Sequence, residues 1–175
     1  MQSPDIPHKT EARAVRLGIT SDAEFIVAYD ELITNARTHQ RGARIEGVLV
    51  QEMAKDGVEA ILGVVNDPQF GPAVMFGLGG IFAEVLKDDS FRLAPVTASV
   101  AREMVEEIAG YPVLAGARGR PRADVEALVD AIVRLSALAV DLKDNIGELD
   151  INPLFVFAEG KGVKAADALI KPVMR

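Results

Sequence analysis

The first third of the chain changes from a strand pattern to a helix pattern. Residues 12–19 (ARAVRLGI) alternate small or apolar side chains with charged ones, which predicts a half-buried strand. Ser21 is then a candidate helix N-cap, and Glu24 three residues later completes a capping box, so we expect a helix that ends near Arg37. Its buried stripe should consist of Phe25, Ala28, Leu32 and Ala36.

The middle of the chain has the pattern of consecutive strands. Residues 44–53 (RIEGVLVQEM) and 58–65 (VEAILGVV) both read as strands, and the residues between them, Lys55 to Gly57, have turn chemistry. We therefore expect these two strands to form an antiparallel hairpin. Further strands are expected at residues 73–77, before a glycine cluster, and at residues 91–96.

The last part combines helices with two closing strands. A helix is predicted from Ala98 to about Ala109, where Gly110 and Pro112 stop it, and a longer one from Asp124 onward. Strands are expected at residues 148–157 and 163–166. This order predicts an α+β fold with a mainly antiparallel sheet flanked by helices. The pattern contains no internal repeat and no linker, so residues 1–175 are interpreted as one domain.

Composition narrows the possible functions. The chain has 26 acidic against 19 basic residues, a net charge of -7, no Trp and 5% aromatic residues. This disfavours a nucleic-acid-binding protein, which needs basic patches and stacking rings. The absence of cysteine excludes disulfides and thiolate metal sites, and it favours the reducing cytoplasm. No apolar stretch reaches the length of a membrane span, so a soluble protein with no membrane contact is expected.

Two segments carry candidate chemistry. Gly79 and Gly80 lie in FGLGGIF, directly after a predicted strand, where backbone N–H groups could cradle phosphate. A tight turn between strands is the simpler reading of these glycines alone. In GELDINP, Glu148, Asp150 and Asn152 alternate along a strand and should share one face, with oxygen ligands of the kind that Mg²⁺ prefers. Asp167, on the adjoining predicted strand, could complete such a site; a solvated strand face is the alternative.

Two further features are less specific. His8 lies in a proline-bounded loop (IPHKT), where a single histidine is usually a surface residue. Arg118, Arg120 and Arg122 crowd into one loop and could bind an anion, although a charged surface loop is the ordinary interpretation.

Taken together, these segments resemble a known family. SPDIPHKT, GVLVQEM, residues 61–96, PVLAGARG and LDINPLFVF look like the nucleotide-binding beta part of the ADP-forming acetate–CoA ligases, or NDP-forming acyl-CoA synthetases. These relatives of succinyl-CoA synthetase have an ATP-grasp fold. The likeness covers nearly the whole chain in order, and the block at residues 61–96 is its most specific part.

The resemblance implies an activity and roles for single residues. In that family acyl-CoA, phosphate and ADP are interconverted with acid, CoA and ATP through phosphohistidine, with a CoA-binding alpha subunit or fused alpha domain as partner. His8 matches the histidine that carries the phosphoryl group to the nucleotide. Asp150, Asn152 and Asp167 match Mg²⁺-binding positions, and Gly79 and Gly80 match the phosphate end of the ATP/ADP site. Gln51, Glu52 and Met53 match the hinge that reads the adenine edge.

The chain also departs from the family pattern. Complete ATP-grasp modules begin with a smaller subdomain that ends in a lysine-bearing strand, and here only Met1 and Gln2 precede SPDI. The resemblance therefore predicts a domain fragment, incomplete at its N-terminus, that binds ATP poorly by itself. Two other functions remain open: a non-catalytic nucleotide-sensing or scaffolding module, and, less favoured, a carboxylate–amine ligase of the same fold. The oligomeric state, homomeric or heteromeric, is also open.

Overall fold

A computed structural model describes residues 1–6, 9–80 and 88–173, and within it the chain divides into two compact units. Unit 1 comprises Met1–Met53, and unit 2 comprises Ala54–Arg175. Each unit has its own cluster of buried apolar side chains, so the two are described separately. Among the described residues, no helix has both the length and the apolar character needed to cross a membrane.

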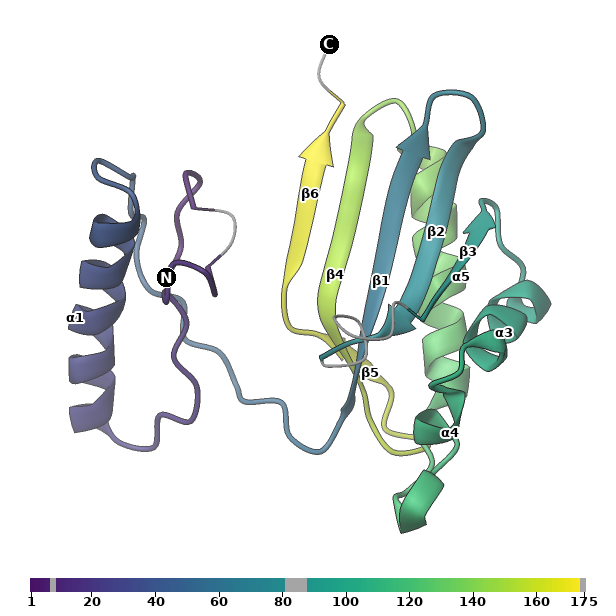
Figure 1. The fold of residues 1–175 in the computed structure, drawn as a ribbon, viewed down its shortest axis with the longest axis horizontal. Helices are drawn as coiled ribbons and strands as arrows, with labels where there is room; N and C mark the ends of the chain where they lie inside the picture. The colour runs from purple at the N-terminus through teal and green to yellow at the C-terminus, as the bar shows by residue number, and fades with distance from the viewer. Residues whose placement is uncertain (7–8, 81–87, 174–175) are drawn as a thin grey trace. The chain divides into compact units, whose positions relative to one another are not determined.

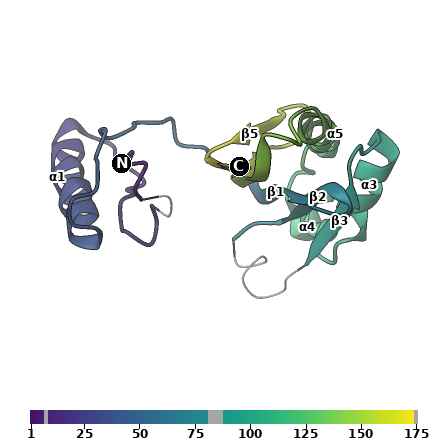
Figure 2. The same ribbon diagram turned by 90° about the horizontal axis from the view of Figure 1, so that it is seen from above.

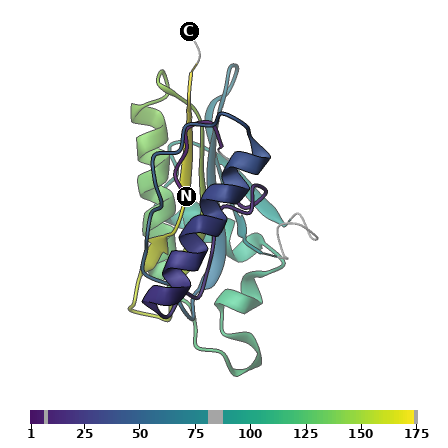
Figure 3. The ribbon, with the colours of Figure 1, turned by 90° about the vertical axis from the view of Figure 1, so that its left-hand side faces the viewer.

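Unit 1 is organised around one helix, α1 (Asp22–His39), which Figure 3 shows in front. The Ser21 side chain accepts a hydrogen bond from the Glu24 backbone N–H, which confirms the predicted N-cap. The Glu24 carboxylate accepts hydrogen bonds from the backbone N–H and the hydroxyl of Thr20. In the capping box, Glu24 therefore binds the residue before Ser21 and not Ser21 itself. Three of the four residues of the predicted stripe are buried, and the fourth is half-buried.

The strands predicted at residues 12–19 and 44–53 are wrong, and so is the hairpin between residues 44–53 and 58–65. Both segments are irregular, and in the described part of unit 1 the only ladder contact is an isolated bridge between Gln2 and Gly47. Positive φ angles at Arg13, Gly18 and Gly47 interrupt extended backbone in both segments. The residue patterns of these two segments were therefore insufficient to predict a strand, because a strand also needs a neighbour with which its backbone can pair.

Unit 2 is built on a six-stranded sheet in which every pairing is antiparallel. The strands are β1 (Val58–Asp67), β2 (Gly71–Leu78), β3 (Asp89–Leu93), β4 (Ile146–Val156), β5 (Val163–Ala165) and β6 (Ala168–Pro172). Their order is β3-β2-β1-β4-β5, and β6 also pairs with β4 (Figure 1). The predicted strands in this part are confirmed within a few residues, whereas β6 was not expected.

The helices of unit 2 are α3 (Ala98–Glu107), the single turn α4 (Tyr111–Leu114), the 3-10 turn η1 (Ala117–Gly119) and α5 (Val125–Asp141). Both long helices were predicted. Helix α5 lies across one face of the sheet, and α3 packs beside it (Figures 1 and 2). Their apolar stripes meet the alternate residues Ala60, Leu62 and Val64 of β1, all at most 3% exposed. The α+β, mainly antiparallel fold is confirmed.

The opposite face of the sheet is open in the described part of unit 2. It carries the other set of alternate residues, because successive side chains of a strand point to opposite faces. Val65 of β1 and Phe91 and Leu93 of β3 belong to this set and are more than half exposed. The register aligns Phe91, Met75, Gly63 and Asp150 across β3, β2, β1 and β4. The open face therefore presents apolar side chains at one edge and Asp150 toward the other.

Candidate functional site

The predicted cation site lies on the open face, where β4 meets β6. Asp150 pairs with Gly63 of β1 on one side and with Leu169 of β6 on the other. Asp167 lies in the bend before β6, and not on a strand as expected. The Asn152 backbone N–H donates to the Asp167 carbonyl oxygen at 3.2 Å, which ties the bend to β4. Asp150, Asn152 and Asp167 are thus brought together by one pair of strands.

The electrostatics of Asp150 agree with this proximity. Burial raises the pKa of the Asp150 carboxyl above its ordinary value, and the negative charge of Asp167 raises this pKa further. Lys171, two residues along β6 from the register partner of Asp150, acts in the opposite direction. A half-buried Asp150 carboxylate whose charge is disfavoured by a neighbouring carboxylate forms a place where a cation would be favourable.

A register shift in β4 sets the direction of Asn152. Ile151 pairs with Leu62 and Leu154 pairs with Ala60, so Asn152 and Pro153 together face the single residue Ile61. Ile151 and Leu154 consequently both pack toward the core, while Asn152 stays on the open side and is exposed. A bulge of this kind re-aims side chains, and such bulges are common beside functional sites.

Glu148, which the alternation pattern placed beside Asp150, has a different partner. Its carboxylate forms an ion pair with the Lys171 ammonium at 2.6 Å, across the β4–β6 pairing. The described residues contain no group of three or more acidic, histidine or cysteine side chains able to hold a metal ion. A cation at Asp150 and Asp167 would therefore need oxygens from Asn152, from water and from a ligand such as phosphate.

The glycine turn, Gly79 and Gly80, lies at the end of β2 and contacts the start of β1. The Gly79 N–H donates to the Glu59 carbonyl oxygen at 2.8 Å, and a Cβ on Gly79 would lie 3.1 Å from the Glu59 Cβ. Gly80 has a φ of +63°, which favours glycine. These features describe the start of the connection between β2 and β3; residues 81–87 lie outside the described residues, so the tight turn stays a prediction.

Glu59 is a residue that sequence reasoning missed. It shares the open face with Asp150, because Glu59 and Gly63 are four positions apart on β1 and Gly63 pairs with Asp150. Four residues of strand span about 13 Å, so the Glu59 carboxylate lies within the reach of a nucleotide bound at Asp150. The available signal was an exposed acidic residue within the apolar run VEAILGVV.

The remaining predicted site residues fall outside unit 2. Gln51, Glu52 and Met53 form an exposed, irregular segment at the end of unit 1. His8 lies outside the described residues, so its proposed role rests on the sequence alone.

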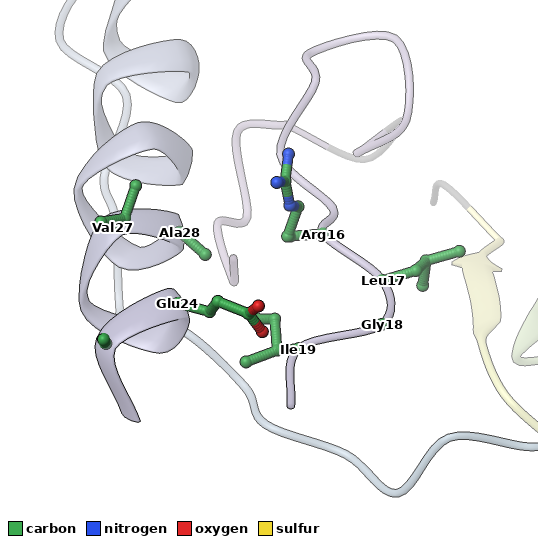
Figure 4. A pocket seen from close by; sticks show the side chains of 8 residues that line it. Arg16, Leu17, Gly18, Ile19, Glu24, Val27 and Ala28 are labelled. Atoms are coloured by element: carbon green, nitrogen blue, oxygen red, sulfur yellow. The ribbon is translucent and has the colours of Figure 1, made fainter. Parts of the chain in front are cut away.

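A cavity of about 370 Å³ in unit 1 contains none of the predicted site residues. It lies between α1 and the extended segment before it, and Leu17, Ile19 and Val27 contribute apolar side chains (Figure 4). Arg16 and Glu24 also line it, but the Glu24 carboxylate accepts hydrogen bonds from Thr20 and the Arg16 guanidinium forms an ion pair with Glu31 at 3.8 Å. The polar side chains of this cavity therefore already have partners within unit 1. The open face of unit 2 is the better candidate for the functional site.

The fold and the site have counterparts among known proteins. The sequence profile of the ATP-grasp domain matches residues 1–171, and the chain therefore belongs to the ATP-grasp family. It is 51% identical to the beta subunit of acetate–CoA ligase (ADP-forming) II from Pyrococcus furiosus, over 97% of this chain and 72% of that subunit. It is also 44% identical to the 4-hydroxybutyrate–CoA ligase (ADP-forming) of Nitrosopumilus maritimus, of which it covers 24%.

Solved structures agree with these relatives. A protein of Pyrococcus horikoshii superposes with a TM-score of 0.93 at 47% identity, covering 99% of this chain and 73% of that one. Acetyl-coenzyme A synthetase 1 of Candidatus Korarchaeum cryptofilum, in complex with coenzyme A and Mg-AMPPCP, has a TM-score of 0.82 at 40% identity. That match covers 98% of this chain and 74% of that one, and the phosphohistidine segment there points towards the nucleotide binding site.

Proposed function

We propose that this chain is the nucleotide-binding part of an ADP-forming acyl-CoA ligase, which transfers a phosphoryl group between phosphohistidine and ADP. The observation that carries the proposal is the meeting of Asp150, Asn152 and Asp167 on the open sheet face. Their oxygens suit Mg²⁺, which usually keeps several waters and binds together with substrate phosphates. The relatives, which are ligases by name, favour an enzyme over a sensing module.

Each residue has a definite task in this proposal. Asp150 and Asp167 hold the cation, Asn152 supplies an amide oxygen, and Mg²⁺ when bound neutralises charge on the nucleotide phosphates. The Gly79–Gly80 turn borders the phosphate end, and the backbone of residues 51–53 reads the adenine edge. His8 carries the phosphoryl group and must be neutral, with one ring nitrogen free to attack phosphorus. Catalysis then depends mainly on positioning and electrostatic stabilisation.

The proposal includes a partner and a compartment. A CoA-binding alpha subunit or domain would bind the acyl-CoA, as in the family that the sequence resembles. The acid is left open, because the names of the relatives include both acetate and 4-hydroxybutyrate. The cytoplasmic location expected from the cysteine-free sequence is part of the same proposal.

The test is the Mg²⁺ dependence of ADP binding by the 175-residue chain, followed by ¹⁵N–¹H NMR so that weak binding is measurable. With Mg²⁺, ADP should shift the amide signals of Asp150, Asn152 and Ala168. Asp150→Asn should weaken the Mg²⁺-dependent binding about tenfold or more, equivalent to about 1.4 kcal/mol, because one hard anionic ligand is lost.

The matched control is Asp144→Asn, which removes the same charge from an exposed residue in the turn before β4. This control should bind Mg·ADP with the affinity of the unaltered chain. ADP binding that is indifferent to Mg²⁺, or a Mg²⁺ dependence that survives Asp150→Asn unchanged, would contradict the proposed site.

A further inference from the structure

The loop between α4 and α5 has a backbone held in one conformation. We call residues 116–123 (GARGRPRA) the arginine loop. Gly116 has a φ of +91°, and a Cβ there would lie 2.8 Å from the Arg120 carbonyl oxygen and 3.3 Å from the Arg122 side chain. Only glycine fits this turn without strain, because the chain folds back so that the Arg120 backbone and Arg122 lie against it.

The C-terminal end of the arginine loop is anchored by backbone hydrogen bonds. The Ala123 N–H donates to the Leu114 carbonyl at 2.8 Å, and the Arg122 carbonyl accepts from the Glu159 N–H at 2.9 Å. The next residue, Asp124, donates its N–H to the Phe157 carbonyl at 2.8 Å. This end of the loop is therefore fastened to α4 and to the segment that follows β4, so Arg122 starts from an anchored backbone.

The loop arginines differ from the helix and strand arginines of unit 2 in their partners. Three of those form ion pairs at 2.6–2.8 Å: Arg92 with Glu107, Arg102 with Glu126 and Arg134 with Asp130. Arg120 and Arg122 are exposed, and neither forms an ion pair with any residue that the structure describes.

The carboxylates adjoining the loop, Asp124 and Glu159, form no ion pair with its described arginine side chains. Both Asp124 oxygens accept backbone hydrogen bonds, from Ala127 at 3.1 Å and from Gly162 at 2.8 Å. Glu159 lies in the adjoining turn between β4 and β5, but the same turn carries Lys161. Among these described residues, Arg120, Arg122 and Lys161 outnumber Asp124 and Glu159, which leaves a local excess of positive charge.

The arginine loop lies at the end of the sheet where β2 finishes. Gly110, just before α4, is packed against Leu78, the last residue of β2, because a Cβ on Gly110 would lie 2.5 Å from the Leu78 side chain. Figure 1 accordingly draws α4 and the loop that follows it below the sheet, at the end of β2. The glycine turn leaves the sheet at this same end.

We propose that the arginine loop binds a phosphate group of a small ligand through the guanidinium groups of Arg120 and Arg122. A guanidinium presents planar paired donors that match phosphate oxygens, and such charge-assisted hydrogen bonds are stronger than neutral ones. This site is separate from the cation site at Asp150, and it needs no metal because its own charge complements the anion.

The proposal is tested by titrating the 175-residue chain with diphosphate, in EDTA and at constant ionic strength, and following the amide signals of residues 116–123. The double variant Arg120→Gln/Arg122→Gln should bind diphosphate about tenfold more weakly. The control double variant Arg102→Gln/Arg134→Gln removes the same charge from helices α3 and α5 and should stay within about twofold of the unaltered chain. The circular dichroism of both variants establishes that each is folded.

Several results would overturn the proposal: no saturable binding of diphosphate, equal losses in the loop and control variants, or loop signals that respond to polyglutamate but not to diphosphate. The source of the phosphate is then identified with three ligands, CoA, dephospho-CoA and ADP. Loop-dependent binding of CoA but not of dephospho-CoA assigns the 3′-phosphate, and loop-dependent binding of all three assigns the diphosphate. If none of the three binds while inorganic diphosphate does, the loop binds a free phosphate anion.

Discussion

Asp124 connects three parts of unit 2, and its replacement gives a prediction whose size follows from the structure. One carboxylate oxygen caps α5 by accepting from the Ala127 N–H at 3.1 Å, and the other accepts from the Gly162 N–H at 2.8 Å. The residue is 8% exposed, so water cannot easily replace it. Asp124→Ala should therefore destabilise unit 2 by more than a surface substitution would.

The two hydrogen bonds contribute separately. Loss of a helix N-cap costs about 1 kcal/mol, and loss of a hydrogen bond from a charged acceptor costs about 1.5–3 kcal/mol. Asp124→Ala should thus lower the free energy of unfolding by about 2.5–4 kcal/mol. Asp124→Ser keeps a cap acceptor but is too short to reach Gly162 as well, so it should lose only about 1.5–3 kcal/mol.

The assay is urea unfolding followed by tyrosine fluorescence. The chain has no Trp and two Tyr, Tyr29 in unit 1 and Tyr111 in unit 2, so a Tyr29→Phe background makes the signal report on unit 2. With an m-value of about 2 kcal/mol/M, a loss of 3 kcal/mol moves the midpoint by about 1.5 M urea. A loss below about 0.5 kcal/mol in Asp124→Ala, or equal losses in the Ala and Ser variants, would refute the reasoning.

The same carboxylate predicts a pH dependence. The backbone N–H groups of Gly162 and then Ala127 hold the pKa of Asp124 below its ordinary value of 3.8. The contribution of the Asp124 carboxylate to the stability of unit 2 is therefore complete when the pH is above that ordinary value. It is lost as the pH falls through the lower pKa of the folded state. Urea midpoints of the unaltered chain and Asp124→Ala should converge in that acidic range and stay apart at neutral pH.

Two further predictions concern the proposed nucleotide site. Because burial and then Asp167 raise the pKa of Asp150, the metal-free protein should become less stable as the pH rises through the interval above the ordinary value of 3.8. Asp150→Asn should remove this pH dependence and stabilise the metal-free chain at neutral pH by up to about 1 kcal/mol. The measurement is thermal unfolding as a function of pH. A loss of stability in Asp150→Asn would contradict this prediction. The second prediction concerns His8→Ala, assayed with labelled phosphate in the presence of the CoA-binding alpha partner. This variant should abolish ATP formation. It should leave phosphorylation of the alpha part intact, because the half-reaction that phosphorylates the alpha part does not use His8. A near-normal rate of ATP formation would exclude His8 as the carrier.

The candidate site could be predicted in part from the sequence. The spacing of Asp150 and Asn152 predicted a shared strand face, because the period of a strand is two residues. The ion pair of Glu148 could not be predicted, because its partner Lys171 belongs to a strand that the sequence did not indicate. Glu59 was missed for a similar reason: its closeness to the glycine turn depends on how β1 and β2 pair.

The sequence by itself determined the elements whose signals are local. Ser21 and Asp124 mark the starts of α1 and α5, and the apolar runs mark β1, β2 and β4, because caps and periodicity act within a few residues. Only the tertiary structure decided which alternating segments became strands, since backbone pairing needs a neighbour that can be distant in sequence. In the described part of unit 1, residues 12–19 have the alternation but no strand partner, and residues 44–53 make only the isolated bridge at Gly47, whereas β6 has a weak pattern and pairs with β4. The meeting of Asp150 and Asp167 was decided in the same way, by the pairing of β4 with β6.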